Sequence, residues 1–245
     1  MRIKIINPNT TASFTAACLA AGRAVASAHT ELVAAHPSTG TPSVECHLEE
    51  AIGTLGVVEQ VRAGETAGMD GYVIACFGDT GLEAAREIAT GPVVGMTEAS
   101  LYVAALIAPV FSIVTLPRRT QVFAERVLRH AGLGHRCLIR AIDVDVLDCE
   151  DEADAVFEPF LAEARRAVSE DHAEAIILGC AGLQPLITRL ESALGVAVIE
   201  GVAAAVKLVE SLLSLRLTTS KRGAWGYPSQ KALAGAADAL AMGQG

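Results

Sequence analysis

The sequence lacks an excess of positive charge and lacks the motifs of several common enzyme classes. Of its 245 residues 28 are acidic and 19 are basic, which gives a net charge of −9. Nucleic acids bind to clustered positive charge, so this balance excludes a nucleic-acid partner. The chain contains no G-x-S-x-G elbow, no phosphate-binding P-loop and no Rossmann glycine fingerprint. Hydrolase, kinase and dehydrogenase functions therefore lose their main support.

The sequence also lacks the layout of a secretion signal. In "MRIKIINPNTT" charged residues are interleaved with apolar ones and Pro8 follows at once, so we expect a cytoplasmic protein. The 18 uncharged residues from 99 to 116 are long enough to be weighed as a membrane span. Because Pro109 divides this run, we predict a short buried helix followed by a buried strand, and no membrane partner.

No Cys-x-x-Cys pair and no regular spacing relates the six cysteines. In a reducing compartment this pattern indicates free thiols, and neither a disulfide framework nor a zinc site. Most free cysteines are small buried hydrophobic residues, which is our interpretation of Cys18, Cys137 and Cys149. The acidic segment 143–154 lacks the glycine and final glutamate of a calcium loop, and "ECHLEEA" lacks the spacing of a zinc helix. We expect no metal site.

Short apolar runs alternate with longer segments of helical period along the chain, in which 51% of the residues are hydrophobic. This alternation is typical of β-α units on a parallel sheet and predicts an α/β fold. The strand candidates divide four and four, and they lie near residues 2–6, 30–35, 72–76, 92–95, 110–115, 136–142, 174–179 and 196–199. Since no linker rich in Pro, Gly and Ser separates the halves, we expect two closely packed domains.

Three helix starts are indicated between these strands. After the first strand, Asn9, Thr10 and Thr11 stand where a helix needs capping oxygens, with Gly22 further along. Thr80 and Glu83 have the spacing of a capping box, which predicts a helix that begins just past Cys76. Pro185 suits the first turn of the helix after the seventh strand.

One sequence pattern occurs twice in the chain in similar form. Residues 72–99 and 175–204 share a strand, a Cys-x-Gly motif, a helix, a glycine near the helix end and a short apolar strand. The two motifs read "VIACFGDTGL" and "AIILGCAGLQ", and they place Cys76 and Cys180 at matching points. Two similar α/β halves that face each other would account for this repeat.

The matching cysteines are the strongest candidates for chemistry. Open parallel sheets bind ligands beyond the carboxyl ends of their strands, which is where Cys76 and Cys180 lie. A helix N-terminus lowers the pKa of a thiol, so we expect thiolate to be accessible. Gly78 and Gly182 let the backbone approach a ligand closely. Packing alone gives no reason for both thiols to occupy matching positions.

Two thiols on opposite sides of one ligand suit the transfer of a proton from one face of a carbon to the other. One thiol acts as the base and the other as the acid, and backbone amides beside each cysteine stabilise the enolate oxygen. The residues therefore predict racemisation or epimerisation next to a carbonyl. Such a reaction requires no cofactor if the proton is acidic enough.

The motifs as a whole resemble the aspartate/glutamate racemase superfamily, and within it the hydantoin racemase branch. The resemblance runs from "IINPNTT" through "VIACFGDTGL", "GPVVGMTEA", "FSIVTL" and "AEAIILGCAGL" to "VIEGVAAAVK" and "TSKRGAW". It implies a cofactor-independent racemase of two α/β/α domains, each with a four-stranded parallel sheet, related by a pseudo-twofold axis with the site between them. It also implies a homo-oligomer.

The resemblance implies roles for particular residues. Cys76 and Cys180 are the proton donor and acceptor. The substrate-binding positions are Asn9, Val44, Phe77, Gly78, Thr115, Ala181 and Gly182. The first domain comprises residues 1–97 with 205–245, and the second comprises residues 98–204. Members of the family often have Asp-Asp-Pro-Gly after the Cys-Phe pair, whereas this chain has Gly-Asp-Thr-Gly at 78–81.

The expected substrate is a 5-substituted hydantoin. Its ring is neutral and its C5 proton is activated by the adjacent carbonyl, so no carboxylate-binding arginine is required, and Arg118 and Arg119 are assigned to the following helix. Allantoin, which is 5-ureidohydantoin, is the nearest alternative; a polar pocket would favour it and an apolar pocket would favour alkyl or aryl hydantoins. The remaining alternatives are an amino acid racemase of the superfamily, a one-cysteine decarboxylase or isomerase of the superfamily, and a non-catalytic two-lobed binding protein.

Overall fold

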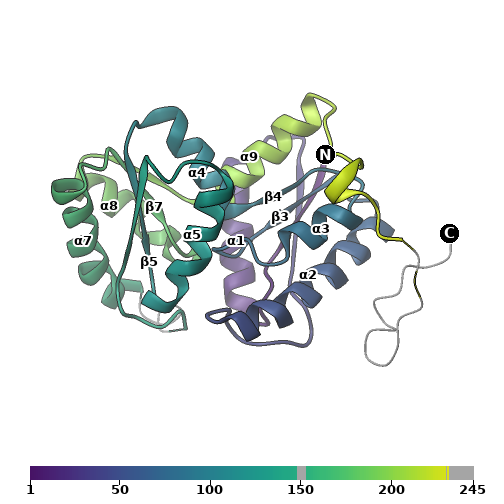
Figure 1. Cartoon of the computed structure of the whole chain (residues 1–245), viewed down its shortest axis with the longest axis horizontal. Helices are drawn as coiled ribbons and strands as arrows, with labels where there is room; N and C mark the ends of the chain where they lie inside the picture. The colour runs from purple at the N-terminus through teal and green to yellow at the C-terminus, as the bar shows by residue number, and fades with distance from the viewer. Residues whose placement is uncertain (148–152, 230, 232–245) are drawn as a thin grey trace.

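Two lobes, each built on one parallel sheet, make up the part of the chain that the computed structural model describes, residues 1–147, 153–229 and 231 (Figure 1). The first sheet has the order β2-β1-β3-β4 and the second has the order β6-β5-β7-β8. All neighbouring strands are parallel. The strands are β1 (Arg2–Ile6), β2 (Glu31–Ala35), β3 (Gly71–Ile74), β4 (Val93–Gly95), β5 (Phe111–Thr115), β6 (Cys137–Ala141), β7 (Ala175–Leu178) and β8 (Ala197–Ile199).

The predicted strands and the α/β class are confirmed, with strand ends that differ from the prediction by two residues at most. Most strand residues are apolar on both faces of each sheet, since both faces are covered by helices. In β3 (Gly71–Ile74) and β7 (Ala175–Leu178), for example, every residue is buried. The identical strand order in the two sheets agrees with the internal repeat in the sequence.

In the part of the chain that the structure describes, four helices cover the first sheet. On one face α1 (Ala12–Val25) and α9 (Gly201–Ser214) pack against alternate strand residues such as Ile5 and Val73. On the other face α2 (His47–Thr66) and α3 (Leu82–Ile88) pack against the intervening strand residues, which include Ile6, Tyr72 and Ile74. The period of two along each strand therefore divides its side chains between two apolar layers.

The second sheet is covered in the same way. Its first layer contains α4 (Met96–Ile107) and α5 (Gln121–His130), and its second contains α7 (Ala153–Glu170) and α8 (Ile187–Leu194). A 3-10 helix, η2 (Ala181–Leu186), joins β7 to α8. Pro185 lies inside η2, and α8 begins at Ile187, so the prediction that Pro185 occupies the first turn of an α-helix is wrong.

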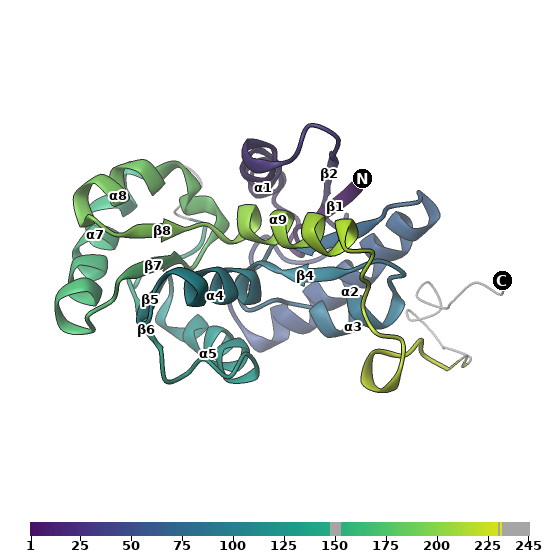
Figure 2. The same ribbon diagram turned by 90° about the horizontal axis from the view of Figure 1, so that it is seen from above.

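The chain crosses between the lobes twice. Helix α4 follows β4 of the first sheet but packs on the second, and α9 follows β8 of the second sheet but packs on the first (Figure 2). The two helices contact each other at the junction. The predicted domain boundaries, 1–97 with 205–245 and 98–204, stay a prediction, and residues 230 and 232–245 lie outside the described residues, as does Cys149.

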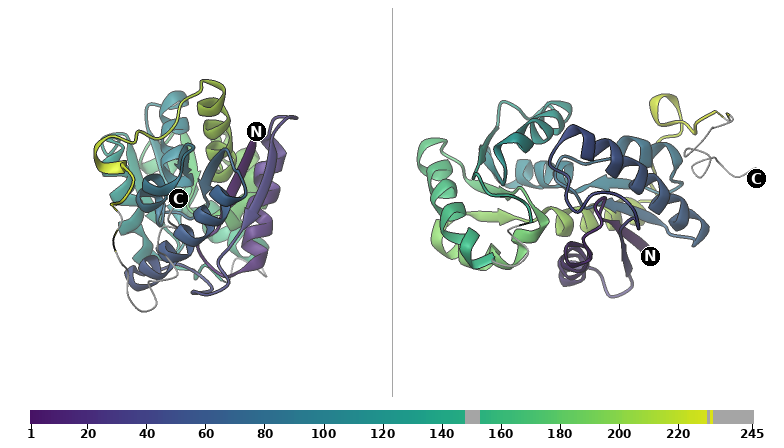
Figure 3. Two further views of the ribbon diagram at one scale, coloured as in Figure 1. Left: turned by 90° about the vertical axis from the view of Figure 1, so that its right-hand side faces the viewer. Right: turned by 90° about the horizontal axis from the view of Figure 1, so that it is seen from below.

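The segment after α9 returns along the first lobe (Figure 3). Thr218 Oγ1 and Lys221 Nζ donate hydrogen bonds to backbone carbonyls of Thr90 and Arg86, and Trp225 Nε1 donates to Glu83 of α3. These contacts connect the C-terminal segment to the lobe that contains the N-terminus.

The uncharged run at 99–116 forms most of α4 and all of β5, as predicted. Pro109 lies between the two elements. Among the described residues no helix combines the length and the apolar character that crossing a membrane requires.

Gly64 in α2 tests how closely the helix packs on the first sheet. A Cβ at this position would lie 2.6 Å from Cε1 of the fully buried Tyr72, whose hydroxyl is bonded to Glu65 Oε1 at 2.6 Å. Alanine normally stabilises a helix by about 1 kcal/mol relative to glycine. Here we expect Gly64→Ala to lower the free energy of unfolding in urea by about 1–3 kcal/mol because of overpacking. Gly134→Ala is the control, because a Cβ added at Gly134 would have no heavy atom within 4 Å beyond its chain neighbours. A free energy of unfolding for Gly64→Ala equal to or above that of the wild type would contradict the packing described.

Candidate active site

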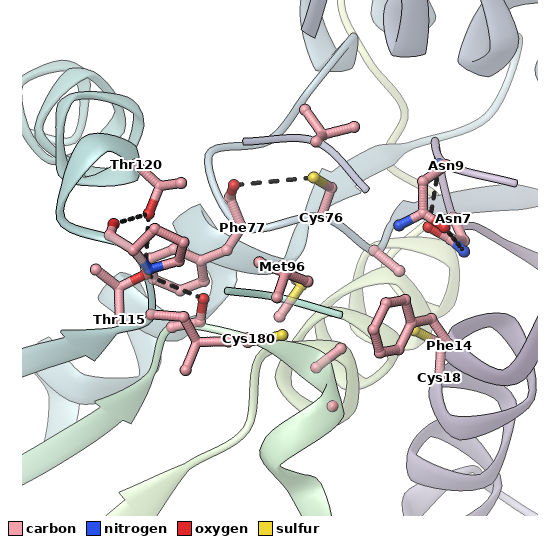
Figure 4. A pocket seen from close by; sticks show the side chains of 18 residues that line it. Asn7, Asn9, Phe14, Cys18, Cys76, Phe77, Met96, Thr115, Thr120 and Cys180 are labelled. Atoms are coloured by element: carbon pink, nitrogen blue, oxygen red, sulfur yellow. Dashed lines mark hydrogen bonds between the residues drawn. The ribbon is translucent and has the colours of Figure 1, made fainter. Parts of the chain in front are cut away.

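A pocket lies where the carboxyl ends of the central strands of both sheets meet (Figure 4). Asn9 follows β1 and Cys76 follows β3 in the first lobe, while Thr115 ends β5 and Cys180 follows β7 in the second. The pocket is lined by Asn7, Asn9, Phe14, Cys18, Val44, Ala75, Cys76, Phe77, Met96, Thr115, Leu116, Pro117, Thr120, Val146, Gly179, Cys180, Ala181 and Gly182.

The structure brings together all the predicted site residues except Gly78. The Gly78 N–H donates to Thr97 Oγ1 at 2.7 Å, and its carbonyl accepts from Arg126 Nη2 at 3.2 Å. A Cβ at Gly78 would lie 2.6 Å from Cβ of Phe123 in α5. Gly78 therefore packs against the second lobe and lies outside the lining of the pocket. Contact of the other predicted residues with a ligand stays a prediction.

Several lining residues were missed from the sequence. Asn7, Ala75 and Gly179 adjoin or nearly adjoin predicted residues, and Met96 and Leu116 directly follow strands β4 and β5. Applying the strand-end rule to every strand would have found these five. Pro117 also lies just past a strand end, two residues after β5. The other four, Phe14, Cys18, Thr120 and Val146, give no local signal and reach the pocket through tertiary packing.

Two asparagines form a buried network in which the orientation of each amide is determined. Asn9 Oδ1 accepts from the backbone N–H of Thr11 at 3.0 Å, and Asn7 Oδ1 accepts from the backbone N–H of Asn9 at 3.2 Å. Asn7 Nδ2 donates to Asn9 Oδ1 at 2.8 Å and also contacts Thr15 Oγ1 at 3.1 Å. A backbone N–H can only donate, so each of these amides must present its oxygen to it.

The Asn9 amide nitrogen is consequently the group that remains for a ligand. In Figure 4 it points toward the middle of the pocket. Within the described part of the chain no hydrogen bond from Asn9 Nδ2 is formed, although Asn9 is only 8% exposed. The site thus offers a hydrogen-bond donor that suits a ligand carbonyl or a developing oxyanion.

The thiol of Cys76 is held in a tight loop. Its Sγ lies 3.5 Å from Thr80 Oγ1 and 3.8 Å from the carbonyl oxygen of Phe77. Burial raises the pKa of the Cys76 thiol to about 12; the Thr80 hydrogen bond opposes this rise, and the nearby Asp79 and Cys180 add to it. The sequence-based expectation of a lowered pKa is therefore wrong for Cys76, because desolvation dominates.

The local reason is that no helix begins next to Cys76. Helix α3 begins at Leu82, and Gly81, with φ of 78°, is its N-cap. Thr80 makes no capping bond to this helix, so the predicted capping box with Glu83 is also wrong. The dipole of α3 lies several residues beyond the thiol, and a helix dipole acts mainly within its first turn.

Cys180 is in an extended conformation at the N-cap of η2. A third thiol, that of Cys18 in α1, also lines the pocket and is 1% exposed. The pKa of Cys18 is raised by burial first and then by Glu200, Cys180 and Cys76, which places the three thiols in one region. Cys18 and Cys137 are buried as predicted.

No residue that lines the pocket in the described part of the chain carries a formal charge. Its polar side chains come from Asn7, Asn9, Thr115 and Thr120, and much of the wall is apolar, including Phe14, Val44, Met96, Leu116 and Val146. Such a pocket suits a small, neutral, ring-shaped ligand.

The fold and the pocket together define a class of two-lobed α/β enzymes in which each sheet supplies one thiol to a shared site. The model of the Asp/Glu/Hydantoin racemase family matches residues 3–209. The hydantoin racemase of Pseudomonas sp. (strain NS671) is 42% identical over 245 residues, which cover 100% of this chain and 98% of that protein. The chain belongs to the Asp/Glu/hydantoin racemase family, and it is an isomerase of the racemase type.

Solved structures agree with this assignment. An allantoin racemase from Klebsiella pneumoniae superposes with a TM-score of 0.95 and 48% identity, covering 98% of this chain and 99% of that one. An allantoin racemase from Pseudomonas fluorescens superposes with a TM-score of 0.92 and 38% identity, covering 96% of this chain and 100% of that one. A glutamate racemase from Francisella tularensis, with 12% identity and a TM-score of 0.64, shares the fold.

The raised pKa of Cys76 predicts slow alkylation by iodoacetamide. At pH 8 a thiol of pKa about 12 is roughly 10⁻⁴ ionised, whereas an ordinary thiol is roughly one-quarter ionised. Peptide mapping by mass spectrometry should show Cys76 reacting at least about 100-fold more slowly in the folded protein than in the same protein in urea. The folded rate should still increase above pH 10, and a plateau near pH 9 would show that burial does not control this thiol.

Proposed function

We propose that this chain racemises 5-substituted hydantoins at C5 through Cys76 and Cys180, without a metal or organic cofactor. The observation that supports the proposal most is that thiols from matching positions of two sheets line one pocket. A base on one face of a carbon and an acid on the other are what inversion by proton transfer requires.

The reaction begins with one cysteine as thiolate and the other as thiol. The thiolate takes the C5 proton, and the electron pair of the broken C–H bond passes to the adjacent carbonyl, forming an enolate. The second thiol then gives its proton to the opposite face of C5, so the two cysteines exchange protonation states in each turnover. Cys76, whose pKa is about 12, is a strong base once it is ionised and a thiol otherwise.

The enolate oxygen needs a donor while it carries charge. Asn9 Nδ2 fills this role in the proposal, because the amide orientation presents a donor to the pocket. Val44, Phe77, Thr115, Ala181 and Gly182 line the space around the ring and are proposed to contact the substrate.

The neutral lining favours a hydantoin over a free amino acid. The carboxylate of an amino acid calls for a cationic partner, whereas Arg118 and Arg119 lie in the 3-10 helix η1 (Arg118–Thr120) and outside the lining. The apolar walls favour an alkyl or aryl substituent at C5. Allantoin is the second candidate, because structures similar to this one belong to allantoin racemases. A homo-oligomeric state and a cytoplasmic location stay predictions.

Hydrogen exchange at C5 tests the two-thiol proposal directly. Single enantiomers of 5-benzylhydantoin, 5-isobutylhydantoin and allantoin in heavy water should lose optical rotation and gain deuterium at C5 faster than enzyme-free controls. Cys76→Ala and Cys180→Ala should each lower the racemisation rate by at least about 10³-fold, because inversion needs both thiols. Cys46→Ser, which replaces the N-cap of α2 with a residue favoured there, should retain activity.

The fastest substrate of the three decides between the hydantoin and allantoin candidates. Exchange and inversion that persist in either alanine variant would contradict the thiol roles. Ligand binding without any turnover, unaffected by either cysteine variant, would support the binding-protein alternative, and turnover of amino acids alone would overturn the substrate class.

Asn9→Asp tests the oxyanion donor. The substitution keeps the shape and the oxygen that accepts from Thr11 N–H, but it replaces the donor with a second oxygen. We expect kcat to fall by about 100- to 1,000-fold with a smaller change in KM, because the interaction strengthens as the enolate forms. Thr10→Ala, in the same segment but outside the lining, is the control, and comparable activity of Asn9→Asp would exclude this donor.

A further inference from the structure

Asp79 occupies an unusual place beside the Cys76 loop, defined here as residues 76–81. It is 7% exposed and has φ of 56°, a conformation that non-glycine residues adopt at a cost. Its backbone N–H donates to the Cys76 carbonyl at 3.0 Å, and its carbonyl accepts from the Leu82 N–H at 3.1 Å. Asp79 thus joins the thiol-bearing residue to the start of α3.

The carboxylate of Asp79 points out of the loop and caps a different helix. Its Oδ1 accepts from the backbone N–H of Thr97 at 2.8 Å, and its Oδ2 accepts from that of Glu98 at 3.0 Å. These amides belong to the first turn of α4, which packs on the second sheet. They need acceptors because the first turn of a helix has none within the helix.

Gly95 makes this arrangement possible. It is the N-cap of α4 and has no side chain with which to cap the helix. A Cβ on Gly95 would overlap the Asp79 carboxylate, so the glycine leaves the space that the carboxylate fills. Thr97 of α4 also binds the loop through its side chain, because its Oγ1 accepts a hydrogen bond from the Gly78 N–H at 2.7 Å.

The two halves of the chain differ at this point. Helix α9 is the counterpart of α4, and its N-cap, Glu200, caps it directly by accepting from Val202 N–H at 2.9 Å and Ala203 N–H at 2.7 Å. The residue that caps α4 comes instead from the loop that holds the first thiol. Within the described residues, the loop that contains Cys76 therefore supplies the cap of α4, whereas α9 is capped by its own N-cap residue.

We propose that Asp79 is a positioning residue that fixes the Cys76 thiol by capping α4 with its carboxylate. The inference rests on the proposed role of Cys76 in proton transfer at C5. Proton transfer needs the sulfur within hydrogen-bond reach of C5, and a displacement of about 1 Å can cost about 100-fold in rate. Loosening the cap should therefore affect the steps that involve Cys76.

The cap also depends on ionisation, since only the carboxylate accepts two N–H groups freely. Burial, with a further contribution from Glu98, raises the pKa of Asp79 to about 7, while the Thr97 and Glu98 N–H groups oppose the rise. The titratable and charged groups around it come from the loop, α2, α3, α4 and α5, and they are Cys76, Glu50, Glu83, Arg86, Glu98, Tyr102, Arg126 and His130. Arg86 pairs with Glu98, and Arg126 pairs with Glu50.

Asp79→Asn is the principal test, because it keeps the size of the side chain but removes one acceptor. We expect kcat to fall by about 10- to 100-fold and KM to change by less than about threefold. The ratio of wild-type to variant kcat should shrink as the pH falls through about 7, because the protonated wild type loses the same cap. Glu210→Gln is the matched control: Glu210 is 4% exposed and accepts from the Ser27 N–H at 2.8 Å, so this variant should lower Tm and leave kcat unchanged.

Substrates deuterated at C5 separate positioning from general loss of structure. In Asp79→Asn the isotope effect on kcat/KM should increase for one enantiomer only, the one whose proton Cys76 removes. Equal changes for both enantiomers, or an unchanged kcat with a lowered Tm, would overturn the proposal. If Asp79→Asn does not fold, Thr97→Val is the second variant, because it keeps Asp79 but removes the acceptor of the Gly78 N–H. It should increase the isotope effect on kcat/KM for the same single enantiomer, by a smaller amount. An unchanged kcat in Thr97→Val would overturn the proposal.

Failure of the proposed function can be told apart from failure of this inference. If the wild type racemises none of the hydantoins, the proposed proton-transfer role of Cys76 fails. Alkylation of Cys76 by iodoacetamide then still tests whether Asp79 fixes the position of the Cys76 thiol. Asp79→Asn should then raise the Cys76 alkylation rate at pH 8 by about tenfold, since the loop is looser and a neighbouring negative charge is gone. A rate equal to that of Glu210→Gln would overturn the positioning role.

Discussion

Parallel pairing of every strand is the constraint on which the rest of the structure depends. Because the strands of a sheet all run one way, their carboxyl ends lie at one edge, and the residues that follow them are brought together there. Two such edges face each other, so Asn9 and Cys76 from one sheet meet Thr115 and Cys180 from the other. The crossing helices α4 and α9 make this possible, since each leaves one sheet and packs on the other. The pocket is thus a product of topology, and the chemistry depends on which side chains stand at the strand ends.

Burial then sets the character of those side chains. The same packing that excludes charge from the lining raises the pKa of Cys76, so the thiol is mostly protonated near neutral pH. A weakly ionised thiol is a poor reagent toward electrophiles in solution but a strong base when ionised, which suits removal of a weakly acidic proton from carbon. The polar groups that remain are oriented by backbone partners: the Asn9 amide is held by the N–H of Thr11 and by Asn7. Preorganised donors of this kind need no rearrangement as charge develops.

The strands and the pair of thiols could be predicted from the sequence because their signals are local. Runs such as Gly71–Ile74 and Ala175–Leu178 are apolar on both faces, and a cysteine follows each strand after one further residue. The helix start after Cys76 was mispredicted because Thr80 and Glu83 imitate a capping box, whereas the backbone turns through positive φ at Gly78, Asp79 and Gly81. The side of the loop that Gly78 faces is decided by Thr97, Phe123 and Arg126, none of which is near it in sequence. Such information exists only once the two lobes are in contact.

The two halves of the duplicated fold are not identical around the thiols that line the pocket. The two strand ends are alike, but the helices that follow β4 and β8 are capped differently: α4 is capped by Asp79 of the Cys76 loop, and α9 is capped by its own N-cap residue, Glu200. The first arrangement puts a buried carboxyl three residues from one thiol, and that carboxyl raises the pKa of Cys76. Gly95 leaves the space that the Asp79 carboxylate fills, while the strand order is the same in both sheets. The difference between the two halves therefore lies in helix capping, which can change by single substitutions while the parallel sheets that define the pocket remain as they are.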